Sequence, residues 1–259
     1  MNLGTPITAK INIIRYNIQD ILNALNMERL TLPEYEVTEG NTPQVIAKKV
    51  RKEWKLEMPV IDNLIAVLES KGIAVASFDF NTERVDSRCV LTKTKYPIII
   101  LNSSLLGDRQ RFSITYQLGH LIMHTATKVS WERDIKHEAN LFAAEFLMPE
   151  EEIRKDFENG VTLPILGDLK TKWKASMISL LYRADDLGLL TPNQKRYLIQ
   201  QFNEQQIRRH EPVELDVPVE KITTIKNWIN EVKKQQQLND NEMASLLHLK
   251  TEEYMELYS

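Results

Sequence analysis

Two histidines four residues apart lie on a segment whose apolar residues recur at helical spacing. The segment is RFSITYQLGHLIMH, Arg111–His124, and the pair is His120 and His124. Side chains at positions i and i+4 share one face of a helix, so both imidazoles could reach one metal ion. The residue after His120 is Leu121, which cannot act as a base. Such a pair could bind a metal ion without activating a water molecule on it.

A hydrolytic zinc helix requires more, and the preceding turn does not supply it. In the pattern H-E-x-x-H two histidines hold zinc, and the glutamate activates the bound water. If His120 is taken as the second histidine of this pattern, the chain has Tyr116 in place of the first histidine and Gln117 in place of the glutamate. A phenol ionises near pH ~10, so it coordinates a metal at neutral pH only at a deprotonation cost. An amide is not a useful base, and loss of the base alone would remove roughly 10²–10⁴-fold in rate.

A second segment, HEANLFAAEFLMP at residues 137–149, offers a third ligand. Its apolar residues recur at helical spacing, and Glu138 and Glu145 flank that stripe. A carboxylate beside an apolar stripe indicates a ligand or a hydrogen bond to a neighbouring helix, against the alternative of an exposed helix charge. We therefore consider His137 or Glu138 as the third ligand beside the histidine pair. The alternative is that the pair lines a cleft or forms hydrogen bonds in the core.

Other parts of the chain must position these two segments. The spacing of apolar residues predicts that most of those parts are helical. Helices are predicted before Gly72 and again from Gly107 onward. Between them, three short strands are predicted at residues 73–80, 88–93 and 96–104. Short loops join the strands, and no parallel β-α-β alternation appears. We therefore expect an α+β fold, mainly helical, with a short antiparallel sheet packed on the helix that carries the histidine pair.

The composition is that of an ordinary globular chain. It has 259 residues, 42% of them hydrophobic, and its formal net charge of -3 gives no overall attraction for nucleic acid. The one cysteine, Cys89, cannot form a disulfide within the chain, so a reducing compartment fits. We see no signal peptide and no apolar run long enough for a bilayer, and expect a cytoplasmic protein without membrane contact. The tryptophans Trp54, Trp131, Trp173 and Trp228 are expected to be packing residues.

The two segments together resemble the ImmA/IrrE-type metallopeptidase family. That family typically shows R-F-T-x-A-H-E-L-G-H-L-x-x-H, followed by E-A-N-x-F-A-A-E-x-L-M-P. The chain has RFSITYQLGHLIMH and HEANLFAAEFLMP in the same order, and the likeness extends over about residues 43–212. The resemblance implies a zincin-like fold, in which the motif helix lies beside a short sheet whose edge strand lines the cleft.

Carried over position by position, the resemblance assigns roles to individual residues. His120 matches the second metal histidine, and Glu138 matches the glutamate ligand. Tyr116 and Gln117 stand where the first histidine ligand and the catalytic glutamate would be. We therefore expect no catalytic residue at this site. The metal candidates are His120, His124 and Glu138, with zinc as the ion that the resemblance implies.

Four segments are expected along the chain. The tail contains LNDNEMASLLHLKTEEYMELY, which resembles a helix-turn-helix. Its five acidic residues against one lysine give poor attraction to phosphate, so a packing or partner-binding helix pair is favoured over DNA contact. The expected segments are an N-terminal helix and linker at 1–41, a degenerate zincin-like domain at 42–160, a helical extension at 161–213 and a C-terminal helical tail at 214–259.

Three functions are consistent with these residues. The resemblance favours a non-catalytic regulatory or binding protein that engages a repressor, toxin or co-encoded regulator, in gene regulation, phage control or a toxin–antitoxin system. An extended peptide could add to the strand at 96–104, and His137, Glu145 and Asn102 are the cleft candidates. The first alternative is a zinc metallopeptidase with an atypical site that cleaves a repressor. The second is a transcription regulator that contacts DNA through its tail or through a partner.

Overall fold

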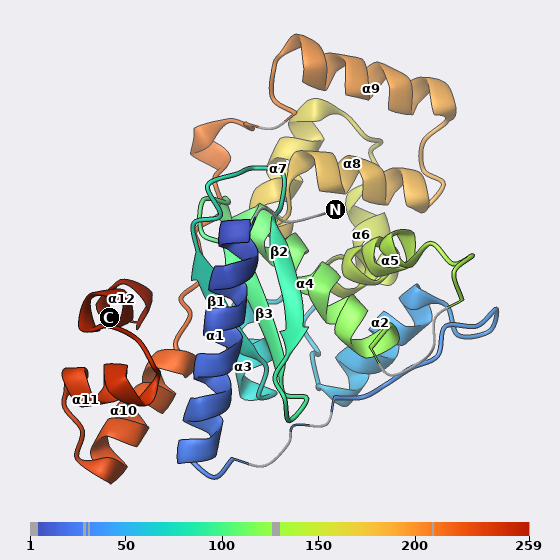
Figure 1. Cartoon of the computed structure of the whole chain (residues 1–259). Helices are drawn as coiled ribbons and strands as arrows, with labels where there is room; N and C mark the ends of the chain where they lie inside the picture. Colours follow the sequence, from blue (N-terminus) through green and yellow to red (C-terminus); the bar gives the residue numbers. More distant parts are fainter. Residues whose placement is uncertain (1–4, 28–29, 31, 126–129, 209, 259) are drawn as a thin grey trace. The chain divides into compact units, whose positions relative to one another are not determined.

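The chain folds into two compact units, each assembled from separate stretches of sequence (Figure 1). Unit 1 combines Met1–Leu32, Asn63–Ser104 and Glu220–Ser259, and unit 2 combines Pro33–Asp62 and Leu105–Val219. The four segments predicted from the sequence stay a prediction. None of the described helices has the length and apolar character needed to cross a lipid bilayer. The computed structural model describes residues 5–27, 30, 32–125, 130–208 and 210–258.

Unit 1 contains a three-stranded sheet in the order β1-β3-β2. The strands are β1 (Ala74–Phe78), β2 (Ser87–Leu91) and β3 (Pro97–Asn102). Every residue of β3 is buried, as expected for an apolar strand with neighbours on both sides and both faces covered. The predicted fold class, mainly helical α+β with one short sheet, is confirmed.

The strand directions correct the prediction of an antiparallel sheet. β2 and β3 are antiparallel, with Cys89 opposite Ile99, but β1 and β3 are parallel, with Ala74 opposite Ile98. The sequence neighbours β2 and β3 form a hairpin, and the wholly buried β3 takes the central place, so β1 pairs with its other edge. Because both edges of β3 are hydrogen-bonded, the expected addition of a peptide to this strand is also wrong.

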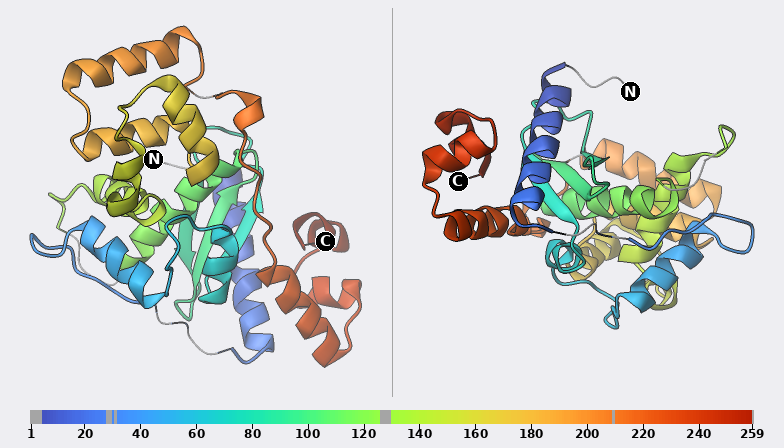
Figure 2. Two further views of the ribbon diagram at one scale, coloured as in Figure 1. Left: turned by 180° about the vertical axis from the view of Figure 1, so that it is seen from behind. Right: turned by 60° about the horizontal axis from the view of Figure 1, so that its bottom comes forward.

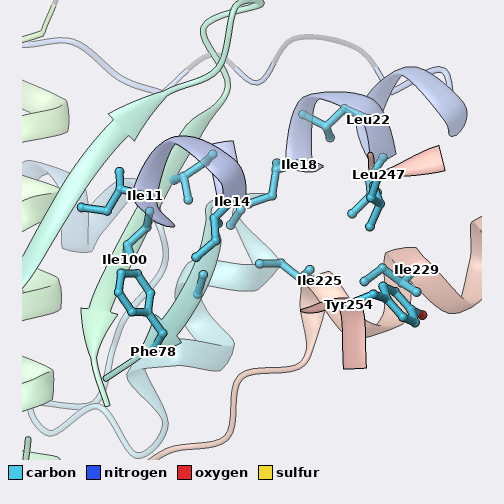
Figure 3. Close-up of a cluster of buried hydrophobic side chains, with 14 of the residues drawn as sticks. Ile11, Ile14, Ile18, Leu22, Phe78, Ile100, Ile225, Ile229, Leu247 and Tyr254 are labelled. Carbon is cyan, nitrogen blue, oxygen red and sulfur yellow. The ribbon is translucent and has the colours of Figure 1, made fainter. Parts of the chain in front are cut away.

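The first helix and the C-terminal helices share one hydrophobic core in unit 1 (Figure 3). Ile14 of the first helix is buried in a cluster with Phe78 and Ile100 of the sheet. The same cluster includes Ile225 and Leu247 from the C-terminal part of the chain. The helices of unit 1 are α1 (Thr5–Ala24), α3 (Leu64–Ser70), α10 (Thr224–Gln236), α11 (Asp240–Leu246) and α12 (Thr251–Tyr258).

Polar contacts join α12, and the turn that precedes it, to α1. The Nδ2 of Asn17 donates to the carbonyl of Leu247 at 2.7 Å, and the hydroxyl of Tyr258 donates to Asn17 Oδ1 at 3.0 Å. Lys10 and Glu256 add an ion pair at 2.8 Å. α10 lies beside α1 in the views of Figures 1 and 2. The helix-turn-helix-like tail is therefore an integral part of unit 1.

Unit 2 is helical, and the helix with the histidine pair begins at a buried charge. α4 starts after Leu106, which provides no side-chain cap, and Asp108 lies buried in its first turn. Threonine and serine side chains cap several of the other helices. The helices of unit 2 are α2 (Pro43–Glu53), α4 (Gly107–Met123), α5 (Ile135–Leu147), α6 (Glu150–Asp156), α7 (Leu163–Trp173), α8 (Met177–Asp186) and α9 (Pro192–Glu204), with a 3-10 turn at Val213–Leu215.

A buried ion cluster connects the start of α4 to the later helices. Lys170 of α7 is completely buried, and its Nζ lies 2.7 Å from both Asp108 Oδ2 and Glu211 Oε2. Glu211 also accepts hydrogen bonds from the backbone N–H groups of Met177 and Ile178, at the start of α8. Burial lowers the pKa of Lys170, but the hydrogen bonds to the two carboxylates outweigh it and leave the pKa raised. The ammonium group of Lys170 therefore joins α7 to α4, and the carboxylate of Glu211 extends the cluster to the start of α8.

We predict that Lys170→Met lowers the free energy of unfolding of the chain by about 3–5 kcal/mol, because Asp108 and Glu211 would stay buried without a cation. Urea denaturation followed by tryptophan fluorescence measures the change. The control is Lys172→Met, which removes an exposed lysine paired with Asp156 and should change stability by less than about 1 kcal/mol. Equal free energies of unfolding of the two variants would show that the buried ion cluster does not stabilise the fold.

Candidate functional site

α4 and α5 approach closely, and their contact brings the sequence-predicted metal ligands together. Gly119 of α4 faces Phe142 of α5, and a Cβ at Gly119 would lie 3.0 Å from Cδ1 of that ring. The absence of a side chain at this position therefore lets the two helices pack against each other. His120 lies in the last turn of α4, His124 is the C-cap residue, and Glu138 lies in the first turn of α5.

A continuous chain of hydrogen bonds joins His120, His124, Glu138 and Arg133, which we call the α4–α5 bridge. The Nδ1 atoms of His120 and His124 are 2.9 Å apart. His124 Nε2 lies 2.8 Å from Glu138 Oε2. Arg133 reaches the same carboxylate with two bonds: its Nε donates to Oε1 at 2.8 Å, and its Nη2 donates to Oε2 at 2.5 Å.

The hydrogen-bonding capacity of these groups indicates one arrangement of protons. An ionised carboxylate only accepts hydrogen bonds, so His124 Nε2 must donate to Glu138. In a neutral imidazole the other nitrogen is then an acceptor, so His120 Nδ1 donates to His124 Nδ1. These tautomers are assigned from the hydrogen-bond pattern. The assignment leaves Nε2 of His120 as the one imidazole lone pair that the bridge does not use.

Burial and charge keep the α4–α5 bridge in this protonation state. Burial is the main cause that lowers the pKa of His120 to about 4, and the neighbouring His124 acts in the same direction. Burial also lowers the pKa of His124, although its hydrogen bond to Glu138 opposes the change. Burial raises the pKa of Glu138, but the hydrogen bonds from Arg133 and His124 outweigh it and hold the pKa below its usual range. At neutral pH the bridge therefore contains two neutral imidazoles, a carboxylate and a guanidinium.

Arg133 is the member of the bridge that sequence reasoning missed. It belongs to the short stretch WERD, which ends at Asp134, the N-cap of α5. The side chain of Asp134 accepts hydrogen bonds from the backbone N–H groups of Lys136 and His137. Because Arg133 precedes the helix, no helical periodicity relates it to Glu138. The available signal was an arginine directly before an N-cap, five residues ahead of a predicted ligand.

Tyr116 and Gln117 stand where the resemblance leads us to expect the first ligand and the base. The ring of Tyr116 meets the imidazole of His120 edge-on, with the centroids 4.7 Å apart and the planes at 83°. This contact is aromatic packing, and it restricts the orientation of the imidazole. Gln117 is 5% exposed, and its amide cannot accept a proton from water. Neither side chain supplies the chemistry that hydrolysis requires at its position.

The donor set of the bridge does not fit a metal ion in this arrangement. Both oxygens of Glu138 accept hydrogen bonds from Arg133, and both nitrogens of His124 are engaged. The ring of His124 stands between His120 and Glu138, where an ion shared by those two residues would have to lie. The guanidinium also repels a second cation beside the carboxylate. In the part of the chain that the structure describes, no group of three or more His, Cys, Asp or Glu side chains is arranged to hold a metal ion.

The three cleft candidates lie in other surroundings. Glu145 is completely buried in unit 2, forms an ion pair with Arg183 and accepts a hydrogen bond from the backbone of Glu150 at the start of α6. Asn102 is completely buried in unit 1, where its Nδ2 donates to the carbonyls of Thr82 and Val85. Its Oδ1 accepts from the backbone of Phe80 and Ser104. These contacts of Glu145 and Asn102 hold the local structure in place. His137 is exposed on α5.

His137 borders a cavity of about 430 Å³ in unit 2, between α4, α5 and α8. Phe112, Leu141 and Ile178 contribute apolar surface to it, and Asn140 and Asp186 contribute polar groups. Its volume is in the range of small-ligand pockets.

Trp131 corrects the expectation that all four tryptophans are packing residues. Trp54 and Trp173 are buried, and the ring of Trp228 packs edge-on against Tyr96, but Trp131 is 90% exposed. It lies two residues before Arg133, in the turn that leads into α5. Fully exposed tryptophans are rare on surfaces without partners and common at the centres of protein interfaces.

We predict that His120 stays neutral in the folded chain until the pH falls to about 4. The unfolded chain protonates this residue near its ordinary pKa of ~6.5. Between these values the unfolded state binds more protons, so the free energy of unfolding falls as the pH is lowered through this window. NMR titration of the imidazole resonances, assigned with His120→Gln, measures the pKa. A midpoint near 6.5 for His120 would contradict the buried, neutral arrangement.

Comparison with known proteins agrees with the resemblance noted in the sequence. Residues 68–185 match the IrrE N-terminal-like domain, a peptidase family. The match includes the whole of α4 and α5, and therefore the α4–α5 bridge. No curated protein matches the chain. Residues 68–185 of the chain therefore form an IrrE N-terminal-like domain, which supports the resemblance to the ImmA/IrrE-type family.

Proposed function

We propose that this chain is a non-catalytic regulatory or binding protein of the ImmA/IrrE type, which engages a protein partner such as a repressor, a toxin or a co-encoded regulator. One observation carries the proposal: Gln117 stands in the place of the general base, and Glu138, the expected ligand, is neutralised by Arg133. Hydrolysis needs an activated water molecule, and these residues provide no group to activate it.

A binding role is supported by surface features beside the same site. Trp131, which is 90% exposed, lies next to the α4–α5 bridge in the sequence. Tryptophan is the residue most enriched among side chains that dominate binding energy at interfaces, because it buries a large area with few rotatable bonds. The cavity at His137 adds a concave surface on α5 that could accept a side chain of the partner. We place the partner-binding surface at the N-terminal end of α5.

The alternatives are less well supported. A zinc peptidase would need Glu138 and His124 to leave their present partners, and would still have no base at Gln117. A DNA-binding role would use α12, the second helix of the helix-turn-helix-like pair. The exposed residues Glu252 and Glu253 on that helix would repel phosphates.

The test uses the products of the genes that flank the gene of this chain: each candidate repressor or toxin among them is purified and mixed with the chain. We expect a stable complex by size-exclusion chromatography and calorimetry, with the regulator intact after prolonged incubation. Addition of EDTA should leave the dissociation constant unchanged. Cleavage of the regulator that stops when EDTA is added would contradict the proposal and support the peptidase.

Two variants test whether the partner binds at the N-terminal end of α5. Trp131→Ala should weaken binding by about 10-fold or more, as for an aromatic residue at the centre of an interface. Tyr197→Ala is the matched control, because Tyr197 is a 61% exposed aromatic residue on α9. It should leave the affinity unchanged. Unchanged binding of Trp131→Ala would exclude this surface.

A further inference from the structure

We propose that Arg133 takes the place of a metal ion in this domain, so that the α4–α5 bridge closes the site and joins the two helices without metal. The proposal concerns the chemistry of the site and not its partner. A bound metal ion does two things for helices that carry its ligands: it compensates the carboxylate charge, and it fixes the distance between the ligands. The bridge does both with side chains.

The charge is compensated by the geometry of the guanidinium. Arg133 meets Glu138 with two N–H groups on two oxygens, at 2.8 and 2.5 Å. This paired arrangement fits the planar fork of arginine and is among the strongest contacts that a carboxylate makes. The side chains of Arg133 and Glu138 are 23% and 15% exposed. Arginine always carries its charge, so the compensation does not depend on the supply of a metal.

The distance between the helices is fixed by the ring of His124. A metal ion would contact His120 and Glu138 directly, but here one imidazole spans them. Its Nδ1 faces His120 at 2.9 Å, and its Nε2 faces Glu138 at 2.8 Å. The ring therefore fills the space of the ion and carries the connection from α4 to α5.

The backbone around Arg133 holds its side chain at the carboxylate. Its N–H donates to the carbonyl of Ser130 at 3.2 Å, and its carbonyl accepts from the N–H of Ile135 at 3.1 Å. Asp134, the next residue, caps α5. The backbone of Arg133 is thus held next to the start of the helix that carries Glu138.

The test compares zinc binding by the full chain and by Arg133→Gln, after both have been stripped with a chelator and dialysed. Competition with a chromogenic zinc indicator gives the affinities. Loss of the guanidinium frees Glu138 and removes the repelling charge, so Arg133→Gln should bind one zinc ion at least 10-fold more tightly than the unaltered chain. Lys136→Gln, which removes an exposed cation from the first turn of α5, should bind zinc like the unaltered chain. Equal zinc affinity of the unaltered chain and Arg133→Gln would overturn the proposal.

A second measurement keeps the test decisive if Arg133→Gln does not fold. The melting temperature of the unaltered chain should be the same in EDTA and in zinc, because the bridge already joins the helices. Glu138→Gln should lower the melting temperature, since it leaves Arg133 without its carboxylate. A melting temperature of the unaltered chain that falls in EDTA and recovers with zinc would show a structural metal and overturn the proposal. Neither result depends on whether a partner is bound, so failure here is distinct from failure of the binding function.

Discussion

The partly buried carboxylate of Glu138 is the constraint on which this account of the domain depends. A carboxylate withdrawn from water needs a cation or several hydrogen-bond donors, and without them it destabilises the fold. In this chain the partners are Arg133 and His124, both from the protein itself. Once those bonds are formed, the arrangement of protons on both histidines follows, both oxygens of Glu138 accept hydrogen bonds, and both nitrogens of His124 are engaged. The proposed non-catalytic role, which rests on Tyr116 and Gln117, and the proposed replacement of the metal by Arg133 are thus consistent with each other.

The same requirement for charge compensation shapes the rest of unit 2. Glu145 is paired with Arg183 of α8, and Lys170 of α7 is paired with Asp108 and Glu211. Each pair joins a helix of the central α4–α5 region to the later helices of the unit. Buried ion pairs contribute less to stability than apolar packing of the same volume, but breaking one is costly. They therefore fix which helices pack together, and they tie the helical extension to the helices that carry the site.

The sequence predicted the elements better than their arrangement. The apolar run at Pro97–Asn102 predicted a strand, but it could not reveal that the strand is central and that β1 lies parallel to it, because strand order depends on contacts between distant residues. Histidine spacing predicted that His120 and His124 share a face, and the structure brings Glu138 to them. Arg133 could not be found in this way, because residues outside a helix carry no periodicity. Glu145 and Asn102 were plausible cleft residues by type, and their burial and partners became visible only in three dimensions.

The most direct test of the central claim is the metal content of the unaltered protein, purified without chelator from cells grown with added zinc. Inductively coupled plasma mass spectrometry on the native chain gives the number of metal ions per molecule. If the α4–α5 bridge takes the place of the ion, the folded protein contains far less than one equivalent of zinc or any other transition metal. One equivalent of tightly held zinc, retained through gel filtration and lost when His120 or Glu138 is replaced, would contradict the account.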